Sequence, residues 1–237
     1  MAENRQKSRF YGRRKGRPLN PARQHALDTL LPELAIPEAV LDEAGTLDPQ
    51  TLFPTAPARV FLEIGFGNGE HLLNLIRNWP DDAFLGAEPF INGMSAFLKA
   101  LENENRHNIR TYMDDAFILA NSLRDASLDG IYILNPDPWP KKKHHKRRII
   151  RYETLNGFAR ILKPGGRLYI STDSDSMAGW VVRHTLTHKA FQWTAERCAD
   201  WQKPPQNWQP TRYEQKGQQA GHRQYYLVFV RGEAATV

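Results

Sequence analysis

The chain has a single cysteine, Cys198, and no apolar run long enough to cross a membrane. One thiol excludes an intrachain disulfide framework and is typical of proteins from a reducing cytoplasm. A membrane span needs about 18 consecutive apolar residues. Residues 1–17 are basic but lack the apolar core of a secretory signal. These absences predict a cytoplasmic protein without a membrane partner.

Positive charge is concentrated in two short segments. Residues 1–17 hold seven Lys or Arg against one acid, and residues 141–151 hold seven more and no acid. The chain has 32 basic and 26 acidic residues, so the remainder has 18 and 25 and a formal charge of −7. A local basic footprint on an acidic body indicates a polyanionic partner. Two solvated tails are the competing interpretation.

The order of apolar and polar segments predicts an α/β fold without internal repeats. Strand patterns alternate with helix patterns from residue 59 onward, which favours a mostly parallel sheet with helices on both faces. Strands are expected at 60–64, 83–87, 109–113, 130–134 and 167–171. Helices are expected at 70–78, 91–103, 116–124 and 148–162, the last ending in a turn at 163–166.

Both ends of the chain differ from this alternating core. Residues 1–25 are predicted to form a basic, flexible arm, and residues 26–237 a single domain with its core at 59–231. The proline-rich stretch 26–58 favours short helices and loops. Residues 192–197 and 225–230 suit an antiparallel hairpin at the sheet edge. Their connection, residues 200–223, is long and polar, as functional loops often are.

A glycine-rich turn follows the first expected strand. Gly65 and Gly67 allow a tight turn and a close approach of the backbone to a ligand. Their spacing departs from the dinucleotide fingerprint, and a plain strand–helix turn is the alternative. Acids stand at three successive strand ends: Glu63, Glu88 and Asp115. Glu88 suits the ribose hydroxyls of a nucleoside, Asp115 the adenine amino group, and Glu63 an ammonium. This set predicts S-adenosylmethionine as the cofactor.

The fourth expected strand ends in a sequence that combines an acid, an indole and a cationic run. Asp137 lies between Pro136 and Pro138, which stiffen the loop, and Trp139 follows. Ligands of open α/β sheets bind at such strand ends. The pattern indicates a carboxylate site for a base beside a phosphate-binding segment.

These motifs together closely resemble the bacterial tRNA (guanine-N7-)-methyltransferase (TrmB) family. The resemblance covers roughly residues 59–230 and rests on the glycine turn, Glu88, Asp115, the Pro-Asp-Pro-Trp sequence, the Lys/His/Arg run and the Thr-Arg-Tyr-Glu sequence at 211–214. It implies a Rossmann-like class I methyltransferase fold with a seven-stranded sheet. It also implies methylation at N7 of guanosine 46 in the variable loop of tRNA. Relatives of this kind occur as monomers and as homodimers.

The resemblance also assigns roles to residues. Glu63, Gly65, Gly67, Glu88, Asp115 and Asp137 would hold the cofactor, and Asp137 would be the catalytic carboxylate. Substrate contacts would come from Lys141, Asp173, Thr211, Arg212, Tyr213 and Glu214. The grip on the RNA would come from Lys143, His144, His145, Lys146, Arg147 and Arg148.

The chemistry of guanine N7 narrows the expected role of Asp137. N7 carries a free lone pair, so its methylation needs no base and gives a cationic purine. We therefore expect Asp137 to orient the guanine through N1–H and N2–H and to offset the developing charge. Trp139 either stacks on the base or packs the loop.

Three alternatives remain at this point. One is a methyltransferase that acts on an exocyclic amine, and a second is a non-catalytic tRNA-binding protein. Neither accounts for all the motifs. The third concerns His184 and His188, whose helical spacing could hold a metal, although no Cys or carboxylate completes the set. No metal is expected.

Overall fold

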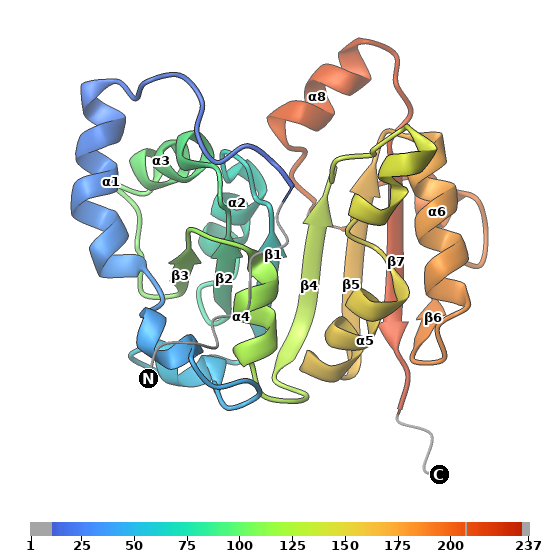
Figure 1. The fold of residues 1–237 in the computed structure, drawn as a ribbon, viewed down its shortest axis with the longest axis horizontal. Coiled ribbons are helices and arrows are strands. Elements are labelled where there is room, and N and C mark those ends of the chain that lie inside the picture. Colours follow the sequence, from blue (N-terminus) through green and yellow to red (C-terminus); the bar gives the residue numbers. More distant parts are fainter. Residues whose placement is uncertain (1–10, 207, 234–237) are drawn as a thin grey trace.

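The computed structural model describes residues 11–206 and 208–233. Its centre is a seven-stranded sheet in the order β3-β2-β1-β4-β5-β7-β6 (Figure 1). Strands β1 to β5 are mutually parallel, whereas β7 pairs antiparallel with both β5 and β6. The strands are β1 (Val60–Ile64), β2 (Ala83–Ala87), β3 (Ile109–Tyr112), β4 (Leu128–Leu134), β5 (Leu162–Thr172), β6 (Phe191–Trp193) and β7 (Tyr225–Arg231). The expected fold class and the edge hairpin are confirmed.

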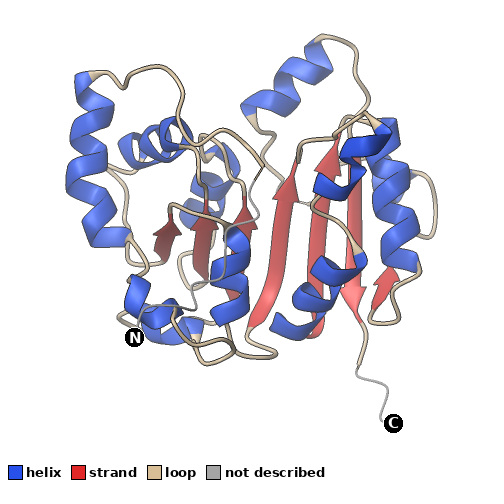
Figure 2. Ribbon diagram, in the orientation of Figure 1, coloured by secondary structure: helices blue, strands red, loops and turns tan. Residues whose placement is uncertain are grey.

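Helices cover both faces of the sheet (Figure 2). The α-helices are α1 (Pro21–Leu34), α2 (Glu70–Asn78), α3 (Ile91–Ala100), α4 (Ala116–Ser122), α5 (Tyr152–Ile161), α6 (Asp175–Leu186), α7 (Ala199–Gln202) and α8 (Arg212–Gln219). Short 3-10 helices are η1 (Glu38–Leu41), η2 (Pro49–Leu52) and η3 (Lys142–Arg147). Short helices in the proline-rich stretch agree with the prediction.

The alternation of side chains along each strand divides the core into two layers. On one face, Phe61, Phe84 and Tyr132 pack with apolar residues of α1, α2 and α3. On the other, Leu62 and Ile131 pack with residues of α4, α5 and α6. All five residues of β1 and all five of β2 are buried, as central strands of a parallel sheet require.

Several element boundaries differ from the sequence-based prediction by a few residues, and two of these differences have local reasons. Helix α5 begins only at Tyr152 and not at residue 148, because the residues before it lead out of the separate 3-10 helix η3. Leu162 pairs with Leu128 before a register shift between Leu128 and Gly130, so the expected turn at 163–166 belongs to the irregular start of β5.

The expected arm is also ordered in part. Helix α1 begins at Pro21, within the range predicted to be flexible, with Asn20 as its N-cap. Residues before α1 lie against α3, because the Gly16 N–H donates to Asn92 Oδ1 at 2.8 Å and Asn92 Nδ2 donates to the Arg17 carbonyl at 2.7 Å. Residues 1–10 lie outside the described part of the chain.

Candidate active site

A cavity of about 670 Å³ opens at the carboxyl ends of β1, β2 and β4. The strand order reverses between β1 and β4, which is where open α/β sheets bind ligands. Gly65, Glu88, Asp115 and Asp137 all line the cavity, so four predicted cofactor residues meet there. We call it the donor cavity.

The glycine turn provides a close backbone approach to this cavity. Gly65 and Gly67 have φ of +71° and +60°, in the left-handed region that favours glycine. No heavy atom lies within 4 Å of where a Cβ would stand at either residue, so the space beside the turn is open. The Gly67 N–H donates to Glu88 Oε2 at 2.7 Å, which ties the turn to the end of β2.

Glu88 is buried and held by two backbone donors. Its second oxygen, Oε1, accepts from the Phe90 N–H at 2.9 Å. Burial raises the pKa of Glu88, and the negative charges of Glu63 and Asp137 act in the same direction, against the two backbone hydrogen bonds. Two backbone hydrogen bonds therefore hold the Glu88 carboxylate in place at the cavity wall.

Glu63 does not line the donor cavity. It is buried at the end of β1, where its Oε2 lies 2.8 Å from Nδ1 of His71, itself buried on α2. Asp115, by contrast, lines the donor cavity and is also the N-cap of α4. Its Oδ1 accepts from the Phe117 N–H at 3.0 Å.

The loop after β4 holds Asp137 in an unusual backbone. Asn135 and Trp139 have φ of +46° and +41°, although neither is glycine. Both the backbone and the side chain of Asn135 are hydrogen-bonded. Its N–H donates to the Ser171 carbonyl at 2.9 Å, and its Oδ1 accepts from Gln224 Nε2 at 2.8 Å. Asp137 is exposed at the cavity mouth. Non-glycine residues in this region often mark functional sites.

The N-terminal segment forms part of the cavity wall, which the sequence analysis did not predict. Tyr11, Gly12 and Arg13 line the cavity. The Arg147 guanidinium lies 5.2 Å from the Tyr11 ring centroid and 4.9 Å from that of Trp139, so it links this segment to the Asp137 loop. The sequence shows only that residues 1–17 and 141–151 are both basic, and this does not predict that Tyr11 contacts Arg147.

Arg148 departs from its predicted role. It is 1% exposed, and its guanidinium donates to the Pro138 carbonyl at 2.8 Å and to Ser176 Oγ at 2.9 Å. It also lies 4.9 Å from the centroid of the Trp180 ring. A buried guanidinium with these contacts is not placed to grip RNA phosphates. It joins the Asp137 loop to the start of α6.

Replacing Arg148 with methionine should therefore lower stability more than RNA affinity. The change leaves the Pro138 and Ser176 acceptors without donors, and we expect the free energy of unfolding to fall by about 3 kcal/mol. Urea unfolding would measure it. Lys146→Met, in the same segment but exposed, is the matched control and should stay within about 0.5 kcal/mol of the native protein. Equal, small effects of both changes would show that Arg148 does not anchor the loop.

The four lysines of the basic segment face solvent. Lys141, Lys142, Lys143 and Lys146 are exposed, and within residues 11–206 and 208–233 none of them is in an ion pair. His144 and His145 pack edge-on against Trp139 and Trp180 respectively. Slight burial lowers the pKa of His144, and the charges of Arg147 and Lys143 add to this effect.

The 211–214 sequence forms the start of α8 above the sheet. Thr211 is the N-cap, accepting from the Glu214 N–H at 3.1 Å. Glu214 is 1% exposed and accepts hydrogen bonds from the Tyr226 hydroxyl and, at 3.2 Å, from Trp208 Nε1. These two residues therefore seat the helix. Arg212 and Tyr213 are exposed, so they remain available to a substrate.

Asp173 directly follows β5 and lies close to Gly217 of α8. Its Oδ2 is 3.3 Å from Nδ1 of His222, and its charge, followed by burial, raises the pKa of Tyr213. The charge of Asp137 acts on Tyr213 in the same direction. The charges of Asp137 and Asp173 therefore both act on Tyr213, and of these three residues only Asp137 lines the donor cavity.

The two histidines of the metal alternative are both engaged in packing. His184 Nδ1 lies 2.8 Å from the Trp180 carbonyl, and His188 Nε2 lies 2.9 Å from Asn156 Oδ1. Among the described residues, no three His, Cys, Asp or Glu side chains cluster as metal ligands.

Within residues 11–206 and 208–233, no helix is long and apolar enough to span a membrane.

Comparison with known proteins agrees with this geometry. The solved 16S rRNA (adenine(1408)-N(1))-methyltransferase of Catenulisporales acidiphilia, with cosubstrate SAM, superposes with a TM-score of 0.54 at 14% identity, over 76% of this chain and 89% of its own. The 16S rRNA methyltransferase KamB gives 0.51 at 12% identity, over 74% and 89%. The strand order and this likeness show a Rossmann-like class I methyltransferase fold.

The sequence comparisons identify the family. A model described as "Putative methyltransferase" matches residues 57–227. The tRNA (guanine-N(7)-)-methyltransferase of Rhizobium meliloti is 46% identical over 222 residues, covering 94% of each chain. That of Rhodospirillum rubrum is 42% identical over 224 residues, covering 94% of this chain and 88% of its own. The chain belongs to the tRNA (guanine-N7-)-methyltransferase family, which confirms the resemblance inferred from the motifs.

Proposed function

We propose that this protein transfers the methyl group of S-adenosylmethionine to N7 of guanosine 46 in the variable loop of tRNA. The observation that carries the proposal is the meeting of Glu88, Asp115 and Asp137 in one cavity beside an exposed lysine-rich segment. Family membership supports the reaction, and the position in tRNA follows the motif resemblance.

The residues of the donor cavity fit the cofactor by their chemistry. Glu88 would hold the ribose hydroxyls and Asp115 the adenine amino group, with Phe117 and Ile133 as apolar walls. Three buried donors, Asn135 Nδ2, Arg147 Nε and Arg151 Nε, have no hydrogen-bond partner among the described residues, and all three residues line the cavity. Unpaired buried donors are costly, so they favour a ligand that brings acceptors, such as the methionyl carboxylate. Glu63, behind the turn, would offset the cofactor's positive charge.

S-adenosylmethionine would supply a methyl group on a sulfonium centre. The N7 lone pair forms the new C–N bond as the C–S bond breaks, so the purine gains the positive charge and no proton moves in this step. Asp137 would accept from N1–H and N2–H of the guanine, and its carboxylate, which lines the donor cavity, would offset that charge. Position 46 lies within the tRNA core, so the base must leave its stack, which costs a few kcal/mol.

Labelled methyl transfer tests the proposal directly. The enzyme is incubated with labelled S-adenosylmethionine and an unmodified tRNA transcript, or with the same transcript carrying adenosine at position 46. We expect label only in the guanosine transcript, released by treatment specific for 7-methylguanosine. Equal incorporation into both transcripts would refute the assigned position, and none into either would refute the function.

Binding of tRNA should depend strongly on salt, because the exposed lysines of the basic segment displace counterions from phosphates. Changing Lys142, Lys143 and Lys146 together to alanine should reduce the slope of log affinity against log salt by about 3. Filter binding at several salt concentrations measures the slope. Lys189→Ala, at an exposed site after α6, is the control and should leave it unchanged. A native slope near zero would rule out a phosphate clamp.

A further inference from the structure

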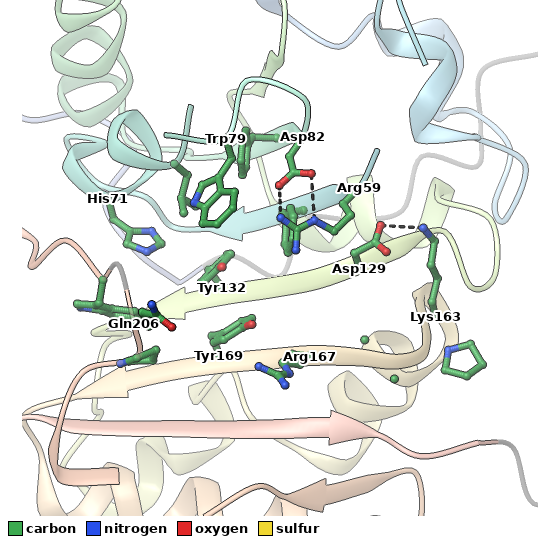
Figure 3. A pocket seen from close by; sticks show the side chains of 18 residues that line it. Arg59, His71, Trp79, Asp82, Asp129, Tyr132, Lys163, Arg167, Tyr169 and Gln206 are labelled. Carbon is green, nitrogen blue, oxygen red and sulfur yellow. Dashed lines mark hydrogen bonds and ion pairs between the residues drawn. The ribbon is translucent and has the colours of Figure 1, made fainter. Parts of the chain in front are cut away.

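A second cavity, of about 580 Å³, lies on the face of the sheet that α2 covers (Figure 3). It shares no lining residue with the donor cavity. Phe61, Tyr132 and Tyr169, from the neighbouring strands β1, β4 and β5, line the cavity and are called its floor. Figure 3 shows Trp79 on one side of the cavity. We call it the sheet-face cavity. Its volume is in the usual range for small-ligand sites, about 300–1,000 Å³.

The floor of this cavity is aromatic and ordered for stacking. Tyr132 and Tyr169 are paired across β4 and β5, with ring centroids 4.5 Å apart and planes 13° apart. Tyr132 is buried, whereas Tyr169 is only partly covered, so a flat group can extend the stack on Tyr169. Aromatic side chains on adjacent strands of an open sheet are a common surface for nucleic-acid bases.

The polar groups around the floor leave one uncompensated positive charge. Arg59 pairs with Asp82 at 2.6 Å, and Lys163 pairs with Asp129 at 2.7 Å, so these four charges cancel. Arg167 also lines the cavity, is exposed, and is in no ion pair within the described residues. One net cation beside an aromatic floor complements a base that carries a single phosphodiester charge.

We propose that the sheet-face cavity binds a nucleotide, with the base against Tyr169 and the phosphate at Arg167. An unpaired residue of the bound tRNA and a free mononucleotide share this chemistry. The charge match favours the RNA residue, and that part of the inference rests on the proposed function. The site lies outside the reaction centre, so it extends the RNA contact beyond the basic segment.

Two contacts connect this cavity to residues near the reaction centre. His71 and Trp208 form its inner end, with ring centroids 4.8 Å apart. His71 holds Glu63 at the end of β1, and Trp208 donates to Glu214 at the seat of α8. A nucleotide that packs against these two rings therefore stabilises both the donor side and the substrate side of the active site.

The test compares variants of the cavity with matched controls in two binding assays. Arg167→Glu is paired with Arg183→Glu, an equal charge change at an exposed residue of α6 on the opposite face. Tyr169→Leu, which removes the ring, is paired with Tyr169→Phe, which keeps it. Thermal unfolding and calorimetric binding of S-adenosylmethionine confirm that each variant is folded with an intact donor cavity.

The first assay is filter binding of an unmodified tRNA transcript, and the second is binding of adenosine 5′-monophosphate by NMR titration. We expect Arg167→Glu and Tyr169→Leu to weaken tRNA binding about tenfold, with changes below about twofold for the two controls. Loss of mononucleotide binding with unchanged tRNA binding would overturn the RNA source and support a free nucleotide. Equal behaviour of variants and controls in both assays would overturn the site. Neither assay uses turnover, so a failure of the proposed methyl transfer would be seen separately.

Discussion

Replacing Glu88 with glutamine is expected to weaken S-adenosylmethionine binding by about 100-fold, because charged hydrogen bonds contribute about 1.5–3 kcal/mol each. Both carboxylate oxygens already accept from backbone donors, Gly67 N–H and Phe90 N–H. A glutamine must point its NH2 group at one of them, which leaves that donor unpaired and loosens the glycine turn. The ribose loses a charged acceptor at the same time. Isothermal calorimetry measures the change.

The pH dependence of binding provides a signature that a merely structural role would not give. Because burial raises the pKa of Glu88, its carboxylate takes up a proton at a higher pH than an exposed acid does. Native donor affinity should therefore begin to fall early on acidification, and the Glu88→Gln variant should lack that part of the profile. Glu102→Gln, an equal charge change at the end of α3, is the control and should behave as the native protein. Native affinity in Glu88→Gln would exclude Glu88 from the cofactor site.

The Asp137→Asn variant should lower kcat for tRNA methylation by about 100-fold, with a smaller change in KM. An asparagine side chain has the same shape but only one acceptor, so it cannot receive both N1–H and N2–H of guanine. It also removes the negative charge that offsets the cationic product, and the loss of one such group typically costs about 10²–10³ in rate. Single-turnover kinetics with saturating S-adenosylmethionine measure the effect.

Asp125→Asn is a suitable control for this experiment. Asp125 is well exposed in the connection between α4 and β4, at the opposite end of β4 from the active site, and it carries the same charge. We expect its kinetics to match the native enzyme. If Asp137→Asn kept native turnover and native affinity, Asp137 would have no charge role in the reaction.

The sequence predicted those elements whose periodicity decides their structure. The spans of β1, β2 and α2 were predicted to the residue, because each is a short, consistently buried or amphipathic run bounded by turn residues. Helix α6 and helix α8 were not predicted. The 200–223 segment that contains α8 is polar, and α8 depends on the Thr211 cap and on the burial of Glu214.

The sequence could not distinguish charges that face solvent from charges that face inward. Arg148 and Lys146 belong to one basic run, yet only Lys146 is exposed. The partners that draw Arg148 inside, Pro138 and Ser176, come from the preceding loop and from α6. Glu63 is similar, since its contact with His71 depends on how α2 packs over β1. Such partners are set by tertiary packing, which composition and spacing do not report.

The backbone of residues 135–139 has a consequence for how the active site can be studied. Two prolines and two non-glycine residues in the left-handed region fix the conformation of this loop. The Arg148 guanidinium holds it further by donating to the Pro138 carbonyl. The conformational entropy of the loop is therefore already lost in the free enzyme. Substitutions of Asp137 should therefore change mainly the rate of methyl transfer. Substitutions of Arg148, which holds the loop through the Pro138 carbonyl, should change mainly the stability of the fold.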